Sequence, residues 1–166
     1  MSTTYVIFDG DKDKWGYGFL KGWAKNENID FEFSDAHDLD GMTGRAQDEY
    51  YVKQKLRERM QKSDAVLVIV GEKTKNLYKF VRWELDLALE LGLPIVVANL
   101  NDKREIDREL CPPVITDACA VHIPFRRAAI KPALDNWPRS FRALNAAEKE
   151  KGPRHYTAET YRSWGL

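Results

Sequence analysis

The feature that most constrains the fold of this chain is Ala65–Val70, an unbroken run of apolar residues. Such a run is typical of a strand that is buried on both faces of a parallel sheet. A helical pattern over about Tyr78–Leu91 follows it and closes with Gly92, the residue favoured just beyond a helix end. Ile95–Asn99 is then a second buried-strand pattern. Strand, helix and strand in this order predict an α/β protein with a mostly parallel sheet.

The preceding residues continue the same alternation. Strands are predicted at Tyr5–Phe8 and Ile29–Phe33, and helices at Tyr17–Lys25 and Tyr51–Lys62. Residues from Ser34 to about Ala46 are polar and without periodicity, which indicates a long loop. We therefore expect a flavodoxin-like, three-layer fold whose central parallel sheet has the strand order 2-1-3-4-5.

The second half of the chain is less regular. Asp102–Leu110 is predicted as a short charged helix, and Ala120–Ile123 as a fifth strand at the sheet edge. An apolar stripe over Ile130–Leu144 predicts a helix, in which Pro138 is expected to produce a kink or two abutting helices.

The pattern predicts a single domain over residues 1–147 and a polar C-terminal tail over residues 148–166. We expect this tail to be loosely attached. The side chains that would dock it instead are Tyr156, Tyr161 and Trp164.

Composition excludes several classes of partner. The 26 basic residues balance the 26 acidic ones, so we expect no nucleic-acid partner and no binding to an anionic membrane surface. No stretch approaches the roughly 20 apolar residues of a membrane helix. The start of the chain runs directly into a strand pattern, so we expect no signal peptide. Cys111 and Cys119 are predicted to be free thiols, and the expected location is the cytoplasm.

Several familiar motifs are absent from the sequence. There is no P-loop, no GxGxxG after the first strand, no GxSxG, and no zinc-ligand spacing, so no metal is expected. Asp9, Asp11 and Asp13 resemble the start of a calcium loop, but Lys14 and Leu20 occupy the positions where that loop needs glycine and glutamate. The aspartates then belong either to a solvated loop or to a ligand crevice at the carboxyl end of the first strand.

Glu84 is the sharpest candidate for a functional residue. Leu87, Ala88 and Leu91 follow it at i+3, i+4 and i+7, so it shares a face that is apolar toward the helix end. A carboxylate near a helix start is also favoured by the helix dipole, by roughly a few tenths to 1 kcal/mol. The pattern leaves two interpretations open, a structural complement to the dipole and a ligand-facing carboxylate.

A longer stretch around this residue resembles a known family. Ser63–Leu100, with Val81–Leu85 at its centre, resembles the third strand, third helix and fourth strand of TIR-like domains. The greatest similarity is to the branch found in Thoeris antiphage defence systems. Val6–Asp13 resembles the opening strand of that family and its acidic loop. The resemblance covers roughly residues 4–100, and the segment Ala120–Leu144 more loosely.

The resemblance implies an enzyme that consumes NAD by cleaving the bond between nicotinamide and ribose. It gives Glu84 the position of the catalytic glutamate and sets Phe8, Asp9 and Asp11 beside the nucleotide. Trp83 would stack on the substrate, shape its pocket or belong to the core. NAD is then the substrate and no separate cofactor is expected. The product would be an ADP-ribose-derived signal, cyclic or conjugated, for a separate effector protein.

The resemblance also leaves an alternative. Many TIR enzymes carry serine or cysteine a few residues before the glutamate, where this chain has Lys79, Phe80 and Val81. Adaptor-type TIR domains keep the fold and act by self-association without catalysis, and fold by itself does not fix function. Self-association is expected in both cases, because TIR enzymes commonly need it to complete their sites.

Overall fold

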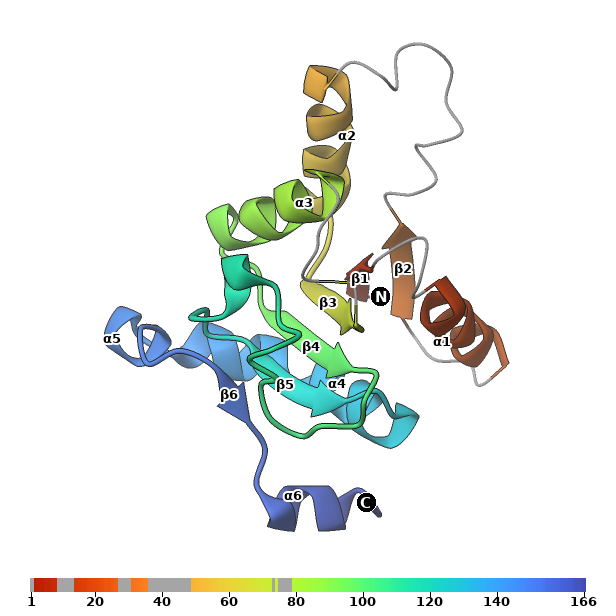
Figure 1. Ribbon diagram of the computed structural model, residues 1–166, viewed down its shortest axis with the longest axis vertical. Coiled ribbons are helices and arrows are strands. Elements are labelled where there is room, and N and C mark those ends of the chain that lie inside the picture. Colours follow the sequence, from red (N-terminus) through yellow and green to blue (C-terminus); the bar gives the residue numbers. More distant parts are fainter. Residues whose placement is uncertain (1, 9–13, 27–30, 36–48, 73, 75–78) are drawn as a thin grey trace.

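The computed structural model describes residues 2–8, 14–26, 31–35, 49–72, 74 and 79–166 (Figure 1). Their strands form one six-stranded sheet in the order β2-β1-β3-β4-β5-β6, with every neighbouring pair parallel. The first five strands therefore lie in the predicted order, and β6 extends the sheet beyond β5. The strands are β1 (Ser2–Ile7), β2 (Phe31–Asp35), β3 (Ala65–Val70), β4 (Ile95–Asn99), β5 (Val121–Pro124) and β6 (Arg154–His155).

The helices alternate with these strands along the chain, as expected for parallel pairing. Each predicted helix of the first hundred residues is present, with ends shifted by three residues or fewer from the predicted ones. The helices are α1 (Lys14–Asn26), α2 (Glu49–Gln61), α3 (Lys79–Glu90), the 3-10 helix η3 (Pro113–Ile115), α4 (Arg127–Ala143), α5 (Ala146–Lys149) and α6 (Ala158–Ser163).

The sheet has an apolar cluster on each face. Along β1, Tyr5 and Ile7 join the cluster beneath α2 and α3. Val6 and Phe8 join the other cluster, which includes side chains of α1, α4 and α6. Successive side chains of a strand point to opposite faces, so helices cover both faces and the three-layer α/β prediction is confirmed.

For the second half, one prediction is wrong, and one of the two alternatives of another prediction is excluded. Asp102–Leu110 forms turns rather than a helix, because the Asp107 carboxylate accepts hydrogen bonds from the backbone N–H groups of Glu109 and Leu110. The helix α4 runs through Pro138 without dividing into two, so two abutting helices are excluded, and the kink stays a prediction. Burial of each large apolar side chain contributes about 1.5–3 kcal/mol, so a continuous buried stripe offsets the roughly 3 kcal/mol cost of an internal proline. That stripe contains Ala129, Ile130, Ala133, Leu134, Trp137 and Phe141.

The segment 148–166 is not loosely attached, and β5 is not an edge strand. The backbone N–H of Arg154 donates to Ala120 O at 2.8 Å, which joins β6 to the end of β5. Tyr161 is buried, and Tyr156 and Trp164 pack against the same apolar cluster. The segment is polar on average, but these three aromatic side chains provide enough apolar contact area to attach it. The boundary between residues 147 and 148 stays a prediction.

Both cysteines are free thiols, as predicted. Burial raises the pKa of Cys111 to about 11 and also raises the pKa of Cys119. Because the thiolate is the reactive form, neither side chain is suited to act as a nucleophile. Within the described part of the chain, no helix is long and apolar enough to cross a membrane.

Candidate active site

The carboxyl ends of the parallel strands define one edge of the sheet. Val70 of β3 is aligned with Asn99 of β4, and Asn99 is aligned with Pro124 of β5. The helix α3 begins at Lys79, shortly after β3 ends, so its first turns start from this edge. Open α/β sheets bind ligands in the crevice outside this edge.

Glu84 lies on the buried face of α3, as its spacing predicts. Its side chain belongs to a residue that is only 1% exposed, and Val81 and Ala88 on the same face are 2% and 0% exposed. Those two neighbours pack in the cluster that contains Ile7 of β1 and Val70 of β3. Glu84 is the sixth residue of α3, about one and a half turns from its start. A carboxylate is therefore held between α3 and the sheet, near the carboxyl edge.

Burial of this carboxylate is a distinctive feature. Acidic residues are almost never fully buried unless they are paired or hydrogen-bonded, and Glu84 does interact with other groups. The other acidic residues of α3, Asp86 and Glu90, are exposed. A purely dipole-complementing glutamate needs no such burial, because the helix dipole acts equally at the surface.

Phe8 and Glu84 belong to different faces of the sheet. Phe8, just beyond the end of β1, is 2% exposed and packs in the cluster with α1 and α4. The structure therefore does not bring its ring onto the α3 face, although its backbone leads to the carboxyl edge. The other two predicted substrate contacts on this side, Asp9 and Asp11, lie outside the described residues.

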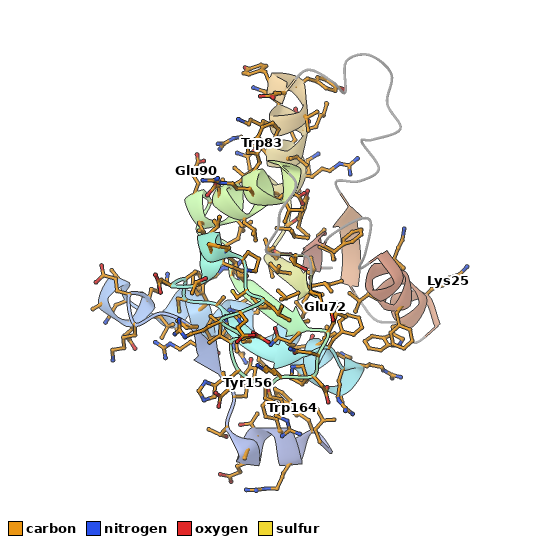
Figure 2. All side chains as sticks on the ribbon, viewed as in Figure 1. Lys25, Glu72, Trp83, Glu90, Tyr156 and Trp164 are labelled. Atoms are coloured by element: carbon orange, nitrogen blue, oxygen red, sulfur yellow. The ribbon has the colours of Figure 1, made fainter. Side chains whose placement is uncertain are left out.

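Trp83 lies on a different face of α3 from Glu84. It lines a groove of about 230 Å³ between α2 and α3, with Leu56 and Leu87 as its apolar neighbours. The Lys53 ammonium is 4.1 Å from the centroid of the Trp83 ring, a cation–π contact. Figure 2 shows Trp83 and Glu90 where α2 meets α3, far from Tyr156 and Trp164. Trp83 and Glu84 are adjacent in sequence, but Trp83 lines the groove whereas Glu84 is buried.

The walls of this groove carry opposite charges. Lys53 and Arg57 come from α2, whereas Asp86 and Glu90 come from α3. The Arg57 guanidinium donates to a Glu90 carboxylate oxygen at 2.8 Å across the groove. Both of these side chains are largely exposed, so the ion pair contributes little to stability. The groove combines one aromatic ring with charges of both signs.

Polar side chains that the sequence analysis did not single out follow the ends of β3 and β4. Thr74 is fully buried, and its hydroxyl accepts the backbone N–H of Gly71 at 2.8 Å. Asn99 is 1% exposed, and its amide donates to Lys103 O at 3.1 Å and Glu105 O at 3.0 Å. The only sequence signal for these two residues was their position at or shortly after the end of a buried strand. Polar residues in this position often shape the carboxyl edge of the sheet.

Asp107 fixes the turns that follow β4. Its carboxylate accepts from the Asn101 amide at 2.8 Å, and the Lys103 ammonium lies 3.2 Å away. Backbone N–H groups of Glu109 and Leu110 donate at 3.0 and 3.1 Å. Burial by itself would raise the pKa of Asp107, but these hydrogen bonds outweigh it and lower the pKa below 3.8.

Replacement of Asp107 by alanine is expected to lower the free energy of unfolding by about 2–3 kcal/mol, because four donors lose the buried, charged acceptor that fixes the turns. The contribution should be present above the ordinary pKa and disappear as the pH falls through the lower native value. Urea unfolding at pH 7 measures the loss, with Asp117→Ala on an exposed turn as the control. A loss below 0.5 kcal/mol would contradict the prediction.

Metal ligation has little support in the described part of the chain. There, no three side chains of histidine, cysteine, aspartate or glutamate come together as a ligand set. His122 is buried in β5 and His155 is exposed in β6.

Comparison with known proteins identifies a family for most of this architecture. Residues 5–105 match the profile described as Thoeris protein ThsB, TIR-like domain. The matched span runs from β1 to just beyond β4 and includes α3 with Glu84. The residues that carried the predicted resemblance lie within it, apart from the looser segment after residue 120.

One solved structure shares the fold at low sequence identity. A 2-deoxyribosyltransferase from the psychrotolerant bacterium Bacillus psychrosaccharolyticus is similar with a TM-score of 0.52 and 13% identity, over 94% of this chain and 100% of the other. FerB, a flavoenzyme NAD(P)H:(acceptor) oxidoreductase from Paracoccus denitrificans, has a TM-score of 0.43 and 22% identity over 60% of each chain. The likeness to the 2-deoxyribosyltransferase supports the α/β fold alone.

Proposed function

This chain belongs to the Thoeris ThsB family of TIR-like domains, and from that premise we propose that it is an NAD-cleaving enzyme. It is an antiphage-defence protein of TIR type by family. The proposed reaction breaks the bond between nicotinamide and ribose. The proposed product is an ADP-ribose-derived signal, cyclic or conjugated, which a separate effector protein detects.

The observation that carries this proposal is the buried carboxylate of Glu84. It is 1% exposed and lies within the family-matched span. The helix that carries it, α3, starts from the sheet edge at which α/β proteins bind ligands. A charge held away from water acts more strongly on a developing charge than one in solvent.

One carboxylate is chemically sufficient for this reaction. Ordinary glycosidases need a second acid to protonate the leaving oxygen, but nicotinamide leaves from a pyridinium cation and takes the bonding electrons as a neutral molecule. Positive charge then develops on the ribose. In the proposed mechanism Glu84 hydrogen-bonds the ribose hydroxyls and stabilises that charge. Water or another acceptor completes the transfer.

The remaining substrate contacts are proposals as well. Phe8, Asp9 and Asp11 follow β1 in the sequence, and we propose that they flank the nucleotide. For Trp83 we propose stacking on a part of the substrate that extends into the groove between α2 and α3. Its half-buried ring makes this feasible, since an aromatic face favours a planar base.

We propose that the enzyme acts in the cytoplasm, in keeping with the free thiols of Cys111 and Cys119. NAD is its substrate, and no further cofactor is invoked. Self-association is proposed to complete the site, because two of its candidate residues come from the single helix α3 and the other three from the β1 end.

Nicotinamide release tests the proposed activity directly. The full chain is incubated with NAD, both alone and in extract from phage-infected cells, and nicotinamide is separated by chromatography. Release is expected in at least one setting, with a rate per protein molecule that rises with protein concentration. If neither setting yields nicotinamide above a protein-free control, the catalytic proposal is wrong.

A non-catalytic role is the second candidate, and an exposed surface favours it. Tyr50 on α2 is 71% exposed and Leu89 on α3 is 40% exposed, on the two helices that form the charged groove. A module that works by self-association through this surface predicts oligomers and a defence phenotype that Tyr50→Ser abolishes. Under this alternative, substitution of Glu84 would leave the phenotype unchanged.

A further inference from the structure

Residues 154–166 lie outside the family-matched span and form a small attachment at the sheet edge. The strand β6 contributes two register pairs with β5, and α6 has six residues. A helix this short is not stable in isolation. Figure 1 shows α6 at the end of the molecule opposite α2. The segment therefore depends on tertiary contacts for its structure.

Three aromatic rings of the segment pack against one another and join the apolar cluster that includes side chains of β5 and α4. The ring of Trp164 is 4.9 Å from that of Tyr156 and 5.4 Å from that of Tyr161, both in edge-to-face geometry. Figure 2 shows Tyr156 and Trp164 next to each other beside α6. The Tyr161 hydroxyl is buried without a hydrogen-bond partner among the described residues. This unsatisfied group opposes the attachment, whereas the packing of Tyr156, Tyr161 and Trp164 in the apolar cluster favours it.

The segment contacts the loop between β4 and η3, residues 100–112, at two places. The Arg104 guanidinium carbon is 4.5 Å from the centroid of the Tyr161 ring. Next to it, a Glu105 carboxylate oxygen is 4.0 Å from His155 Nε2. Consecutive loop residues thus reach both α6 and β6.

The same part of the loop is tied to the carboxyl edge of the sheet. Asn99, the last residue of β4, donates to the carbonyls of Lys103 and Glu105. Arg104 therefore lies between two carbonyls that one buried side chain holds. A displacement of Arg104 would be transmitted to Asn99, at the edge where ligands bind in such folds.

We infer that residues 154–166 form a reversible clasp that positions the β4–η3 loop, with Arg104 and Tyr161 as the positioning pair. The clasp is reversible because its pairing with β5 is short and its buried hydroxyl is unsatisfied, features of segments that open locally. Opening releases the loop while the rest of the sheet stays folded.

Hydrogen exchange of the loop amides in the full chain tests the clasp. Arg104→Gln should raise the exchange of residues 100–107 about two- to fivefold, the range expected for loss of one exposed cation–π contact. Tyr161→Leu should raise it further. The double variant should exchange no faster than Tyr161→Leu, since both substitutions remove the same contact.

Two matched variants separate the clasp from general destabilisation. Tyr161→Phe keeps the ring and removes only the unpartnered hydroxyl that opposes the attachment, so loop exchange equal to or slower than that of the wild type is expected. Lys149→Ala removes a cation–π contact to Phe141, at 4.3 Å, and should leave the loop unchanged. Unaltered loop exchange in Arg104→Gln overturns the inference. Equal increases in Arg104→Gln and Lys149→Ala do so as well.

A kinetic readout connects the clasp to the carboxyl edge, and this part rests on the proposed NAD cleavage. Arg104→Gln is expected to raise KM for NAD about two- to fivefold, while kcat changes by less than about twofold. Hydrogen exchange requires no NAD, so it remains interpretable if the chain lacks this activity. A loop that opens without any change in KM refutes the connection to the substrate site and leaves the clasp itself intact.

Discussion

Glu84→Gln is expected to lower the rate of nicotinamide release at least about 100-fold, the effect typical of removing one preorganised electrostatic group from an active site. Glutamine has nearly the same shape as glutamate but carries no charge, so it cannot stabilise the cationic ribose. Because Glu84 is only 1% exposed, solvent cannot replace the lost charge. Steady-state rates at saturating NAD measure the effect.

The fold should survive this substitution, because the amide fills the same volume and avoids burying a charge. Circular dichroism and the melting temperature verify this. Glu58→Gln on α2 is the matched control, since Glu58 is exposed and forms only an i,i+3 ion pair with Lys55; its rate should equal the wild-type rate. Glu84→Asp keeps the charge but withdraws it by one methylene, and a displacement of about 1 Å can cost a factor of about 100. Full activity of a folded Glu84→Gln would exclude the proposed role.

Acidification from pH 6.5 to pH 4 is expected to remove roughly 3 kcal/mol from the free energy of unfolding through His122 alone. His122 in β5 is fully buried, and neither ring nitrogen has a hydrogen-bond partner among the described residues. Burial, together with the smaller effect of the positive charges of Arg108 and His155, lowers its pKa from 6.5 to about 4.

The direction follows from proton binding in the two states. Between pH 6.5 and pH 4 the unfolded chain binds a proton at His122, whereas the native chain keeps the ring neutral. The native state is therefore fully favoured above pH 6.5 and loses stability as the pH falls toward 4. Below pH 4 both states bind the proton, and this contribution to the pH dependence ends.

Urea unfolding at pH 7.0, 5.5 and 4.5 measures this loss, with His122→Leu as the comparison. Leucine removes the titrating ring and two unpartnered nitrogens, so at pH 7 it should change stability by less than about 1.5 kcal/mol. The difference in stability between pH 7.0 and 4.5 should be at least about 2 kcal/mol smaller in His122→Leu. Equal pH dependence in both proteins would show that His122 does not stay neutral in the native state.

Much of the fold was predictable from local sequence. The apolar runs Ala65–Val70 and Ile95–Asn99 coincide with β3 and β4 without an end shift, because a strand buried on both faces leaves no polar position to blur its limits. The burial of Glu84 was also indicated by its spacing to Leu87 and Ala88. These are properties of one element, which periodicity reports directly.

Other features depended on contacts between distant residues. Asp107 lies in a segment whose charge pattern predicts a helix, but its carboxylate accepts two nearby N–H groups and produces turns. Tyr161 lies in a segment whose polar composition predicts a loose tail, with this ring as one of three side chains that would dock it instead, and it is 1% exposed against the sheet. For Asp107, side-chain hydrogen bonds to the backbone compete with those of a helix. For Tyr161, the apolar cluster is formed by residues far away in the sequence. Composition reports neither kind of contact.

The same distinction between local sequence and long-range contacts applies to the candidate site. The sequence by itself determined the α/β layering, the family resemblance and the choice of Glu84, since each depends on residue type and period along one segment. Only the tertiary structure decided that Phe8 packs on the opposite face from α3, that Trp83 opens to a groove with Lys53, and that residues 154–166 hold the β4–η3 loop. The physical reason is that the face of a sheet, and the neighbours across a groove, are set by how separate elements pack rather than by the order of residues within them.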